Sequence, residues 1–135
     1  MKGGEEKMRN ILFDASYSFD TAAALAFLLK EAQVGKEVQL QGLTALYGKQ
    51  HSADDSLARF KETLTLHGSK AHAAPGASEP LFTDYKWENF PESAPAQPAR
   101  RAWDVFYSTA LRLEGDVEIF AAGPLTNLAI FIKKY

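Results

Sequence analysis

The sequence predicts an α/β protein with three layers, in which a Rossmann-like parallel sheet of about four strands lies between helices. Short apolar runs alternate with segments of helical character four times along the chain, and such alternation indicates parallel strands joined by helical crossovers. The length of 135 residues, of which 46% are hydrophobic, suits one globular domain. We therefore expect residues 1–135 to form a single domain, with a flexible segment at 1–9.

The first half of the chain contains two strand–helix units. Residues 11–13 are an apolar run that ends at Asp14, and residues 21–29 are rich in alanine and leucine, as a largely buried helix would be. Residues 38–47 first alternate and then become apolar, which is typical of a strand that becomes increasingly buried. In residues 52–67, apolar side chains recur at helical spacing behind two aspartates that suit the positive end of a helix dipole.

Two further units follow in the second half. Residues 70–74 form a candidate short strand that a Pro-Gly pair closes. Residues 82–100 contain several prolines, which predict an irregular loop. Helical spacing returns at 101–113, an apolar strand is expected at 117–122, and a last helix at 125–134 begins behind a proline and ends with lysines.

Composition and charge exclude several classes of function. Fifteen basic and 17 acidic residues give a net charge of -2, so no broad cationic field attracts nucleic acid or an anionic membrane. The absence of cysteine excludes disulfides, thiolate zinc sites and a cysteine nucleophile. The first ten residues lack the apolar core of a signal peptide. We expect a cytoplasmic protein with no nucleic-acid partner and no membrane segment.

Four motifs occur in order at the predicted strand ends, where parallel α/β sheets bind ligands. They are ILFDASYSFDTAAAL at 11–25, LQGLTALYGK at 40–49, PGASEPL at 75–81 and AAGPLTNLA at 121–129. In order and spacing these motifs resemble the amino-terminal half of the inosine-uridine nucleoside hydrolase family. The resemblance implies a nucleoside hydrolase-like fold and, as the ancestral reaction, hydrolysis of the N-glycosidic bond of ribonucleosides.

The first motif of the family carries four aspartates, Asp-x-Asp-Pro-Gly-x-Asp-Asp. The corresponding residues here are Asp14, Ser16, Asp20 and Thr21. In the family, the first aspartate supports the loop, the second is a calcium ligand and the base that activates water, the third contacts ribose, and the fourth is a calcium ligand. The resemblance therefore implies Asp14 and Asp20 as candidate catalytic residues, with Asp20 also binding substrate, whereas Ser16 and Thr21 replace metal ligands.

Three more positions follow from the resemblance. The backbone carbonyl of Ala122 corresponds to a calcium ligand of the family, and it does not depend on the side chain. Lys49 stands where the second motif usually has asparagine, and Asn127 completes the GPLTN motif; both are candidate substrate-binding residues. Since hydroxyls replace two carboxylates, calcium binding should weaken by orders of magnitude. We therefore expect neither a metal nor another cofactor.

Structural alternatives accompany these candidates. Asp14 is also explained as an acceptor of loop hydrogen bonds, and Asp20 as the N-cap of the following helix. The ammonium of Lys49 either pairs with one of these aspartates in the vacated cation space or is solvated. Thr126 and Asn127 are explained equally well as residues that brace the start of the last helix. His51, His67 and His72 are too scattered to suggest a metal site.

The leading interpretation is a diverged nucleoside hydrolase-like protein, because loss of a general base costs about 10²–10⁴ in rate and the resemblance covers only half of the family architecture. The alternative is a non-catalytic protein that binds a ribosyl ligand or serves in an oligomeric assembly. An exposed sheet edge predicts a homo-oligomer or a complementary subunit. Four aromatic residues of the proline-rich segment suggest either base stacking or packing against the body or another chain. They are Phe82, Tyr85, Trp87 and Phe90.

Overall fold

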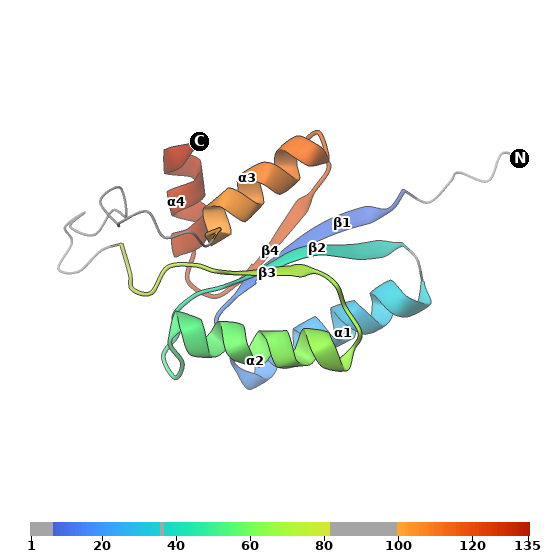
Figure 1. The fold of residues 1–135 in the computed structure, drawn as a ribbon, viewed down its shortest axis with the longest axis horizontal. Coiled ribbons are helices and arrows are strands. Elements are labelled where there is room, and N and C mark those ends of the chain that lie inside the picture. The colour runs from blue at the N-terminus through green and yellow to red at the C-terminus, as the bar shows by residue number, and fades with distance from the viewer. Residues whose placement is uncertain (1–6, 36, 82–99) are drawn as a thin grey trace, which may run out of the picture.

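A computed structural model of the chain describes residues 7–35, 37–81 and 100–135. Within them, four parallel strands alternate with four helices (Figure 1). The strands lie in the order β3-β2-β1-β4. The elements are β1 (Arg9–Ala15), α1 (Phe19–Val34), β2 (Val38–Ala45), α2 (Ala53–Leu66), β3 (His72–Pro75), α3 (Ala102–Arg112), β4 (Glu118–Ala122) and α4 (Thr126–Lys134). The predicted α/β class, with a parallel sheet of four strands, is confirmed.

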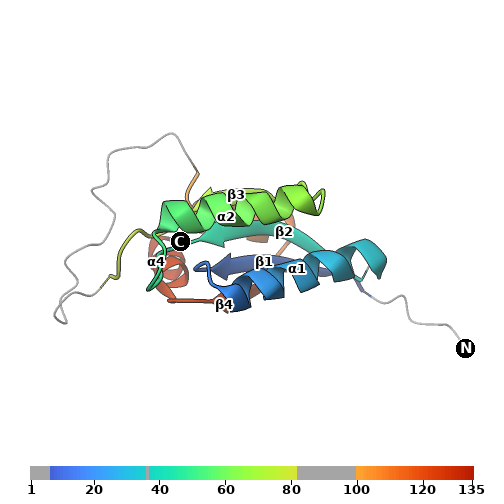
Figure 2. The same cartoon turned by 90° about the horizontal axis from the view of Figure 1, so that it is seen from below.

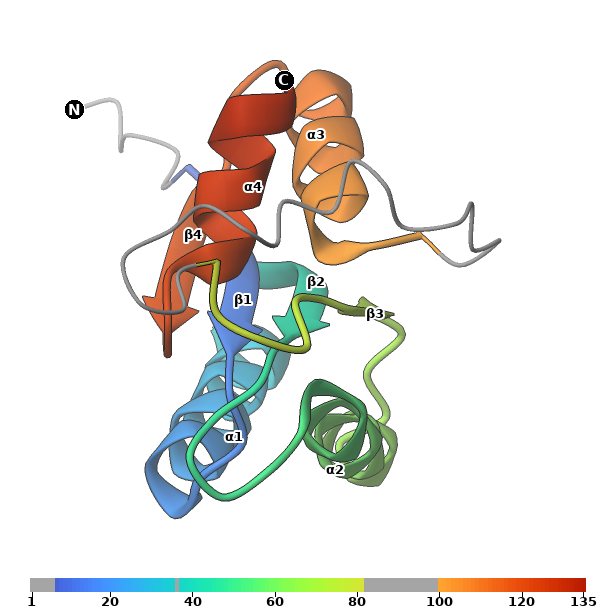
Figure 3. The same ribbon diagram turned by 90° about the vertical axis from the view of Figure 1, so that its left-hand side faces the viewer.

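Helices cover both faces of the sheet. α1 and α2 lie side by side on one face (Figure 2), and α3 and α4 lie together on the other (Figure 3). The central strand β1 serves both layers, because neighbouring side chains of a strand point to opposite faces. Ile11 and Phe13 pack into the core below α1 and α2, whereas Leu12 packs with Val105 and Phe106 of α3.

Several boundaries differ from the sequence predictions. Arg9 belongs to β1 and its guanidinium pairs with Glu118 at 2.7 Å, so this end of the segment expected to be flexible is part of the sheet. β2 ends at Ala45 because the N–H of Tyr47 leaves the ladder and donates to the carbonyl of Ala77 at 3.1 Å. The rest of the loop predicted at 82–100, with its four aromatic residues, lies outside the described residues; only Arg100 is described, in irregular structure.

The strand order creates a topological switch between β1 and β4. The chain leaves β1 for α1 on one face of the sheet and leaves β4 for α4 on the other. At such a switch point, α/β sheets commonly bind ligands at the carboxyl ends of the strands. Gly123 follows β4 there, and a Cβ at this position would lie 3.0 Å from the backbone nitrogen of Ser16. The switch point thus brings the first and last motifs of the sequence together.

Among the helices of the described residues, none has both the length and the apolar character required to cross a membrane.

Candidate functional site

Asp14 is the centre of the hydrogen-bond network at the carboxyl edge of the sheet. It precedes the last residue of β1 and its side chain is only 1% exposed. Its Oδ1 accepts one hydrogen bond from the hydroxyl of Thr44 on β2 at 2.6 Å and another from the amide of Asn127 on α4 at 2.8 Å. Its Oδ2 has no hydrogen-bond partner among the described residues. One oxygen of this carboxylate therefore holds the fold together and the other is unpaired.

Asn127 extends the network to β3. The residue is fully buried, and its Oδ1 accepts a hydrogen bond from the N–H of Ala77 at 2.7 Å. A Cβ at Gly76 would lie 2.2 Å from the amide nitrogen of Asn127, so this packing requires glycine. Asn127 thus braces the loops, as one sequence interpretation proposed. A contact with substrate stays a prediction, and in this arrangement the Asn127 side chain is buried.

Tyr47 closes the network on the side of α4. Besides the backbone bond to Ala77, its hydroxyl is 2.9 Å from the hydroxyl of Thr126, the first residue of α4. Segments that follow all four strands are therefore joined to one another through side chains or loop backbone. Such a network holds the loops in fixed positions, because a loop that moved would leave buried polar groups without hydrogen-bond partners, and this lowers the stability of the fold.

Burial controls the protonation of Asp14. Loss of hydration raises the pKa of its carboxyl from 3.8 to about 6, while the hydrogen bonds from Thr44 and Asn127 act in the opposite direction. Desolvation is the largest effect because it disfavours the charged form. Within the described part of the chain, Asp14 forms no ion pair that would offset this penalty. The network therefore contains a carboxyl group whose pKa lies well above its ordinary value.

The loop between β1 and α1 is closed by a capping box. Ser18 is the N-cap of α1; its Oγ accepts from the N–H of Thr21 at 3.2 Å, and the Thr21 hydroxyl oxygen accepts from the N–H of Ser18 at 2.8 Å. The Thr21 hydroxyl also lies 2.8 Å from the carbonyl of Ser16, to which it donates. The prediction that Asp20 is the N-cap is wrong, because Asp20 lies in the first turn and is exposed.

Ser16 occupies the switch point itself. Positions 48 and 123 flank it so closely that a Cβ at Gly48 would lie 2.9 Å from the Ser16 Cβ, and one at Gly123 would lie 3.1 Å from its Oγ. The backbone of Ala122 is adjacent, since Ala122 pairs with Ala15 in the sheet register. The loops therefore bring together Ser16 and Ala122, two of the three residues that the family resemblance places at metal-ligand positions.

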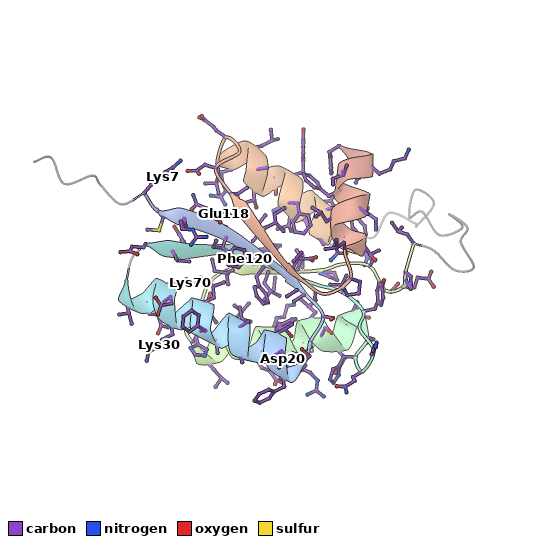
Figure 4. All side chains as sticks on the ribbon, turned by 180° about the vertical axis from the view of Figure 1, so that it is seen from behind. Lys7, Asp20, Lys30, Lys70, Glu118 and Phe120 are labelled. Carbon is purple, nitrogen blue, oxygen red and sulfur yellow. The ribbon has the colours of Figure 1, made fainter. Side chains whose placement is uncertain are left out.

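Asp20 and Lys49 lie at the rim of this region, and both are exposed. Figure 4 shows Asp20 at the beginning of α1. Neither Asp14 nor Asp20 forms an ion pair with Lys49 in the described structure. The predicted alternative in which the Lys49 ammonium pairs with Asp14 or Asp20 is therefore wrong for this structure. The exposure of Lys49 agrees with the other alternative, a solvated ammonium.

A second polar cluster was not identified from the sequence. His51 Nδ1 is hydrogen-bonded to the carboxylate of Asp55, which also accepts from Arg59 Nε at 3.0 Å. The bonds from Arg59 and His51 lower the pKa of Asp55. Tyr17, next to Ser16, packs edge-on against the His51 ring with centroids 5.3 Å apart, and its N–H donates to Ser56 at 3.1 Å. The four-residue spacing of Asp55 and Arg59 was the available signal, since such residues are neighbours on a helix, whereas His51 precedes α2.

Together, the fold and the polar network define an α/β protein with a candidate ligand site at the carboxyl ends of its strands. The chain belongs to the inosine-uridine preferring nucleoside hydrolase family, whose sequence profile matches residues 11–135. The predicted family resemblance is thus confirmed.

A solved structure described as an inosine-guanosine nucleoside hydrolase superposes on this fold with a TM-score of 0.66 at 22% sequence identity. The match covers 94% of this chain and 42% of that chain, so the present sequence spans less than half of that relative's length. This likeness concerns the fold. No curated protein matches the sequence significantly. In the described residues, no group of three or more histidine, cysteine, aspartate or glutamate side chains could hold a metal ion.

Proposed function

We propose that the carboxyl edge of the sheet binds the ribosyl group of a nucleoside, and that this diverged family member does not perform efficient calcium-assisted hydrolysis. The observation that carries the proposal is the contrast within one loop. Hydrogen bonds to Asp14 join β1 to Thr44 and Asn127, and a further one joins Asn127 to Ala77, whereas the hydroxyl of Thr21 is used by the capping box. The scaffold of a ligand site is thus present without the carboxylates that a metal requires.

The donor set does not fit calcium. Calcium takes six to eight oxygen ligands, typically with several carboxylates. The oxygens on offer are Asp14 Oδ2, the Ser16 hydroxyl and the Ala122 carbonyl, and the single carboxylate among them is 1% exposed. The Thr21 hydroxyl already donates to the carbonyl of Ser16. Our proposal therefore includes no metal cofactor, and it derives no catalytic step from one.

Ligand binding is assigned to the exposed rim. Asp20 supplies acceptors for ribose hydroxyls, and Lys49 supplies a donor in the loop after β2; both side chains are accessible to a ligand. Asp14 is assigned a positioning role, because its burial separates it from a ligand at the rim. Proton transfer by Asp14 or Asp20 in a residual hydrolysis stays a prediction. At position 16, where the family has its catalytic aspartate base, this chain has serine.

Calorimetric titration with inosine and with uridine, in buffer containing EDTA, tests this assignment. We expect saturable binding that weakens about tenfold on Asp20→Asn or Lys49→Met, since each removes the charge from a proposed hydrogen-bonding group. Asp54→Asn, which changes an exposed acid in the first turn of α2, is the matched control. Binding that is absent from the wild-type protein, or equal in all four proteins, would contradict the proposed site.

A second candidate function is assembly with other copies of the chain. It is favoured by apolar side chains exposed on α1 and on the edge strand β4, such as Phe27 at 68% and Phe120 at 40% exposure. Such residues are usual at protein interfaces. A complementary subunit is the alternative partner. The cytoplasmic location expected from the sequence stays a prediction.

A further inference from the structure

A cavity on the α3 side of the sheet, here called the arginine cavity, is lined by cationic and polar side chains that the proposed function does not use. It has a volume of about 360 Å³ and lies where α3 packs on β2 and β3 (Figure 3). Cavities of about 300–1,000 Å³ are typical of sites for small molecules. The polar residues that line it are Gln41, His72, Arg100, Ser108, Thr109 and Arg112.

Two guanidinium groups are held at adjacent turns of α3. Arg100 precedes the helix, and its Nη2 donates a hydrogen bond to the hydroxyl of Ser108. Arg112 lies in the last turn, and its Nη2 donates to Oε1 of Gln41 on β2 at 2.9 Å. Ser108 and Arg112 are four residues apart, so they lie on the same side of the helix. Each guanidinium is therefore fixed by one hydrogen bond and keeps further N–H donors for a ligand.

The positive charge of the arginine cavity is not compensated within the described residues. No carboxylate belongs to its described lining, and neither Arg100 nor Arg112 forms an ion pair in that part of the chain. The protein as a whole carries a net charge of -2, so this concentration of positive charge is a local feature. A planar guanidinium binds the oxygens of phosphate through paired N–H donors. The cavity therefore favours an anion.

The hydroxyl of Thr109 supplies a further donor. The residue is only 5% exposed and lines the cavity, yet its hydroxyl forms no hydrogen bond within the described part of the chain. The hydroxyl of the adjacent Ser108, by contrast, donates to the carbonyl of Val105 and accepts from Arg100. Since a mostly buried hydroxyl is usually hydrogen-bonded, the Thr109 hydroxyl is available to a ligand in the cavity.

We propose that the arginine cavity binds a phosphate group, either as the free ion or as the monoester of a small metabolite. Arg100 and Arg112 bind separate phosphate oxygens, and the Thr109 hydroxyl donates to another. Three donor groups from different positions suit the several terminal oxygens of a phosphate better than the two oxygens of a carboxylate. The exposed imidazole of His72, at the start of β3, lies at the rim of the cavity.

This site is separate from the proposed nucleoside site. Gln41 lies three residues before Thr44 on β2, which corresponds to about 10 Å along the strand, and Thr44 is a hydrogen-bond partner of Asp14. Neither Asp20 nor Lys49 lines the arginine cavity. Phosphate binding therefore does not depend on nucleoside binding, and either proposal can fail without the other.

Calorimetric titration of the full chain with inorganic phosphate and with glycerol 3-phosphate tests the site. Glycerol is the uncharged control, and about 0.15 M NaCl screens loose attraction between charges. We expect binding at millimolar or lower concentration, weakened about tenfold by Arg100→Gln and by Arg112→Gln, because each removes a hydrogen bond to a charged group. Lys61→Gln removes an equal charge from an exposed position on α2 and should leave the affinity unchanged.

The two ligands distinguish the sources of the phosphate group. Tighter binding of glycerol 3-phosphate than of inorganic phosphate would support a monoester, and affinity that is no tighter would support the free ion. Wild-type protein that binds neither compound at millimolar concentration would overturn the proposal. Equal affinity of the wild-type protein and both arginine variants would overturn it as well.

Thr109→Val separates ligand binding from folding. Valine has nearly the shape of threonine, and the hydroxyl has no partner within the described residues, so the free energy of unfolding without phosphate should not fall. Phosphate binding should weaken several-fold, and the stabilisation that phosphate gives against urea should decrease accordingly. A variant that binds phosphate like the wild-type protein, or one that is less stable without phosphate, would overturn the assignment of the hydroxyl to the ligand.

Discussion

Asp14 combines nearly complete burial with a carboxylate oxygen that no donor of the described residues reaches. A buried charge without an ion-pair partner is costly, and here two hydrogen bonds to the other oxygen offset only part of that cost. The sequence predicted that Asp14 lies at a strand end and accepts hydrogen bonds. Its partner Asn127 is 113 positions away, and local patterns carry no information about a contact at that separation.

The raised pKa of Asp14 makes stability depend on pH with a definite sign. Because folding raises this pKa from 3.8 to about 6, the folded protein binds the proton more tightly than the unfolded chain does. The resulting stabilisation is complete below about pH 3.8 and is lost as the pH rises through about 6. The free energy of unfolding of the wild-type protein, relative to Asp14→Asn, should therefore fall by about 2–3 kcal/mol between about pH 4 and pH 7.

Urea unfolding of both proteins across this range measures the difference, and other titrating groups cancel in the comparison. Asparagine retains an acceptor for Thr44 and Asn127 but does not titrate. A difference that stays constant with pH would contradict the raised pKa. A difference that changes in the opposite direction would indicate that a cation stabilises the Asp14 carboxylate.

At the scale of elements, the β1–α1 loop shows how much a local pattern can predict. The helix was expected from its apolar content, but its start was assigned to Asp20 instead of Ser18. Both residue types are good N-caps, and the structure selects Ser18 because Thr21, three residues later, returns a hydrogen bond to it. Residues 52–67 were likewise predicted to form a helix with apolar side chains at helical spacing, yet Leu66, at the end of α2, is 85% exposed.

The two candidates for the cap make different predictions. Ser18→Ala should lower the free energy of unfolding by about 1 kcal/mol, because it removes the acceptor for the Thr21 N–H. Asp20→Ala should cost about 0.5 kcal/mol or less, since it removes only a charge near the positive end of the helix dipole. Thermal and urea denaturation measure both variants. A larger loss for Asp20→Ala than for Ser18→Ala would contradict the assigned capping box.

At the scale of the whole molecule, strand–helix alternation predicted the fold class, and four ordered motifs predicted the family, which the profile match confirms. The site was predictable only in part. The resemblance predicts that Ser16 and Thr21 are altered metal positions, and this stays a prediction. The hydrogen bond of the Thr21 hydroxyl within the loop depends on three-dimensional contacts. The contact between the rings of Tyr17 and His51 was likewise not predictable from the sequence, because the two residues are 34 positions apart.

The central claim, that this carboxyl edge binds nucleosides without efficient calcium-assisted hydrolysis, is tested most directly by the release of free nucleobase. The purified protein is incubated with inosine and uridine in excess calcium or in EDTA, and the free base is quantified by chromatography over time. We predict equal release in both conditions, close to the rate without protein, because our proposal is that the hydroxyls at Ser16 and Thr21 do not replace the carboxylates of a calcium site. Calcium-dependent release well above that rate, abolished by Asp20→Asn, would contradict the claim.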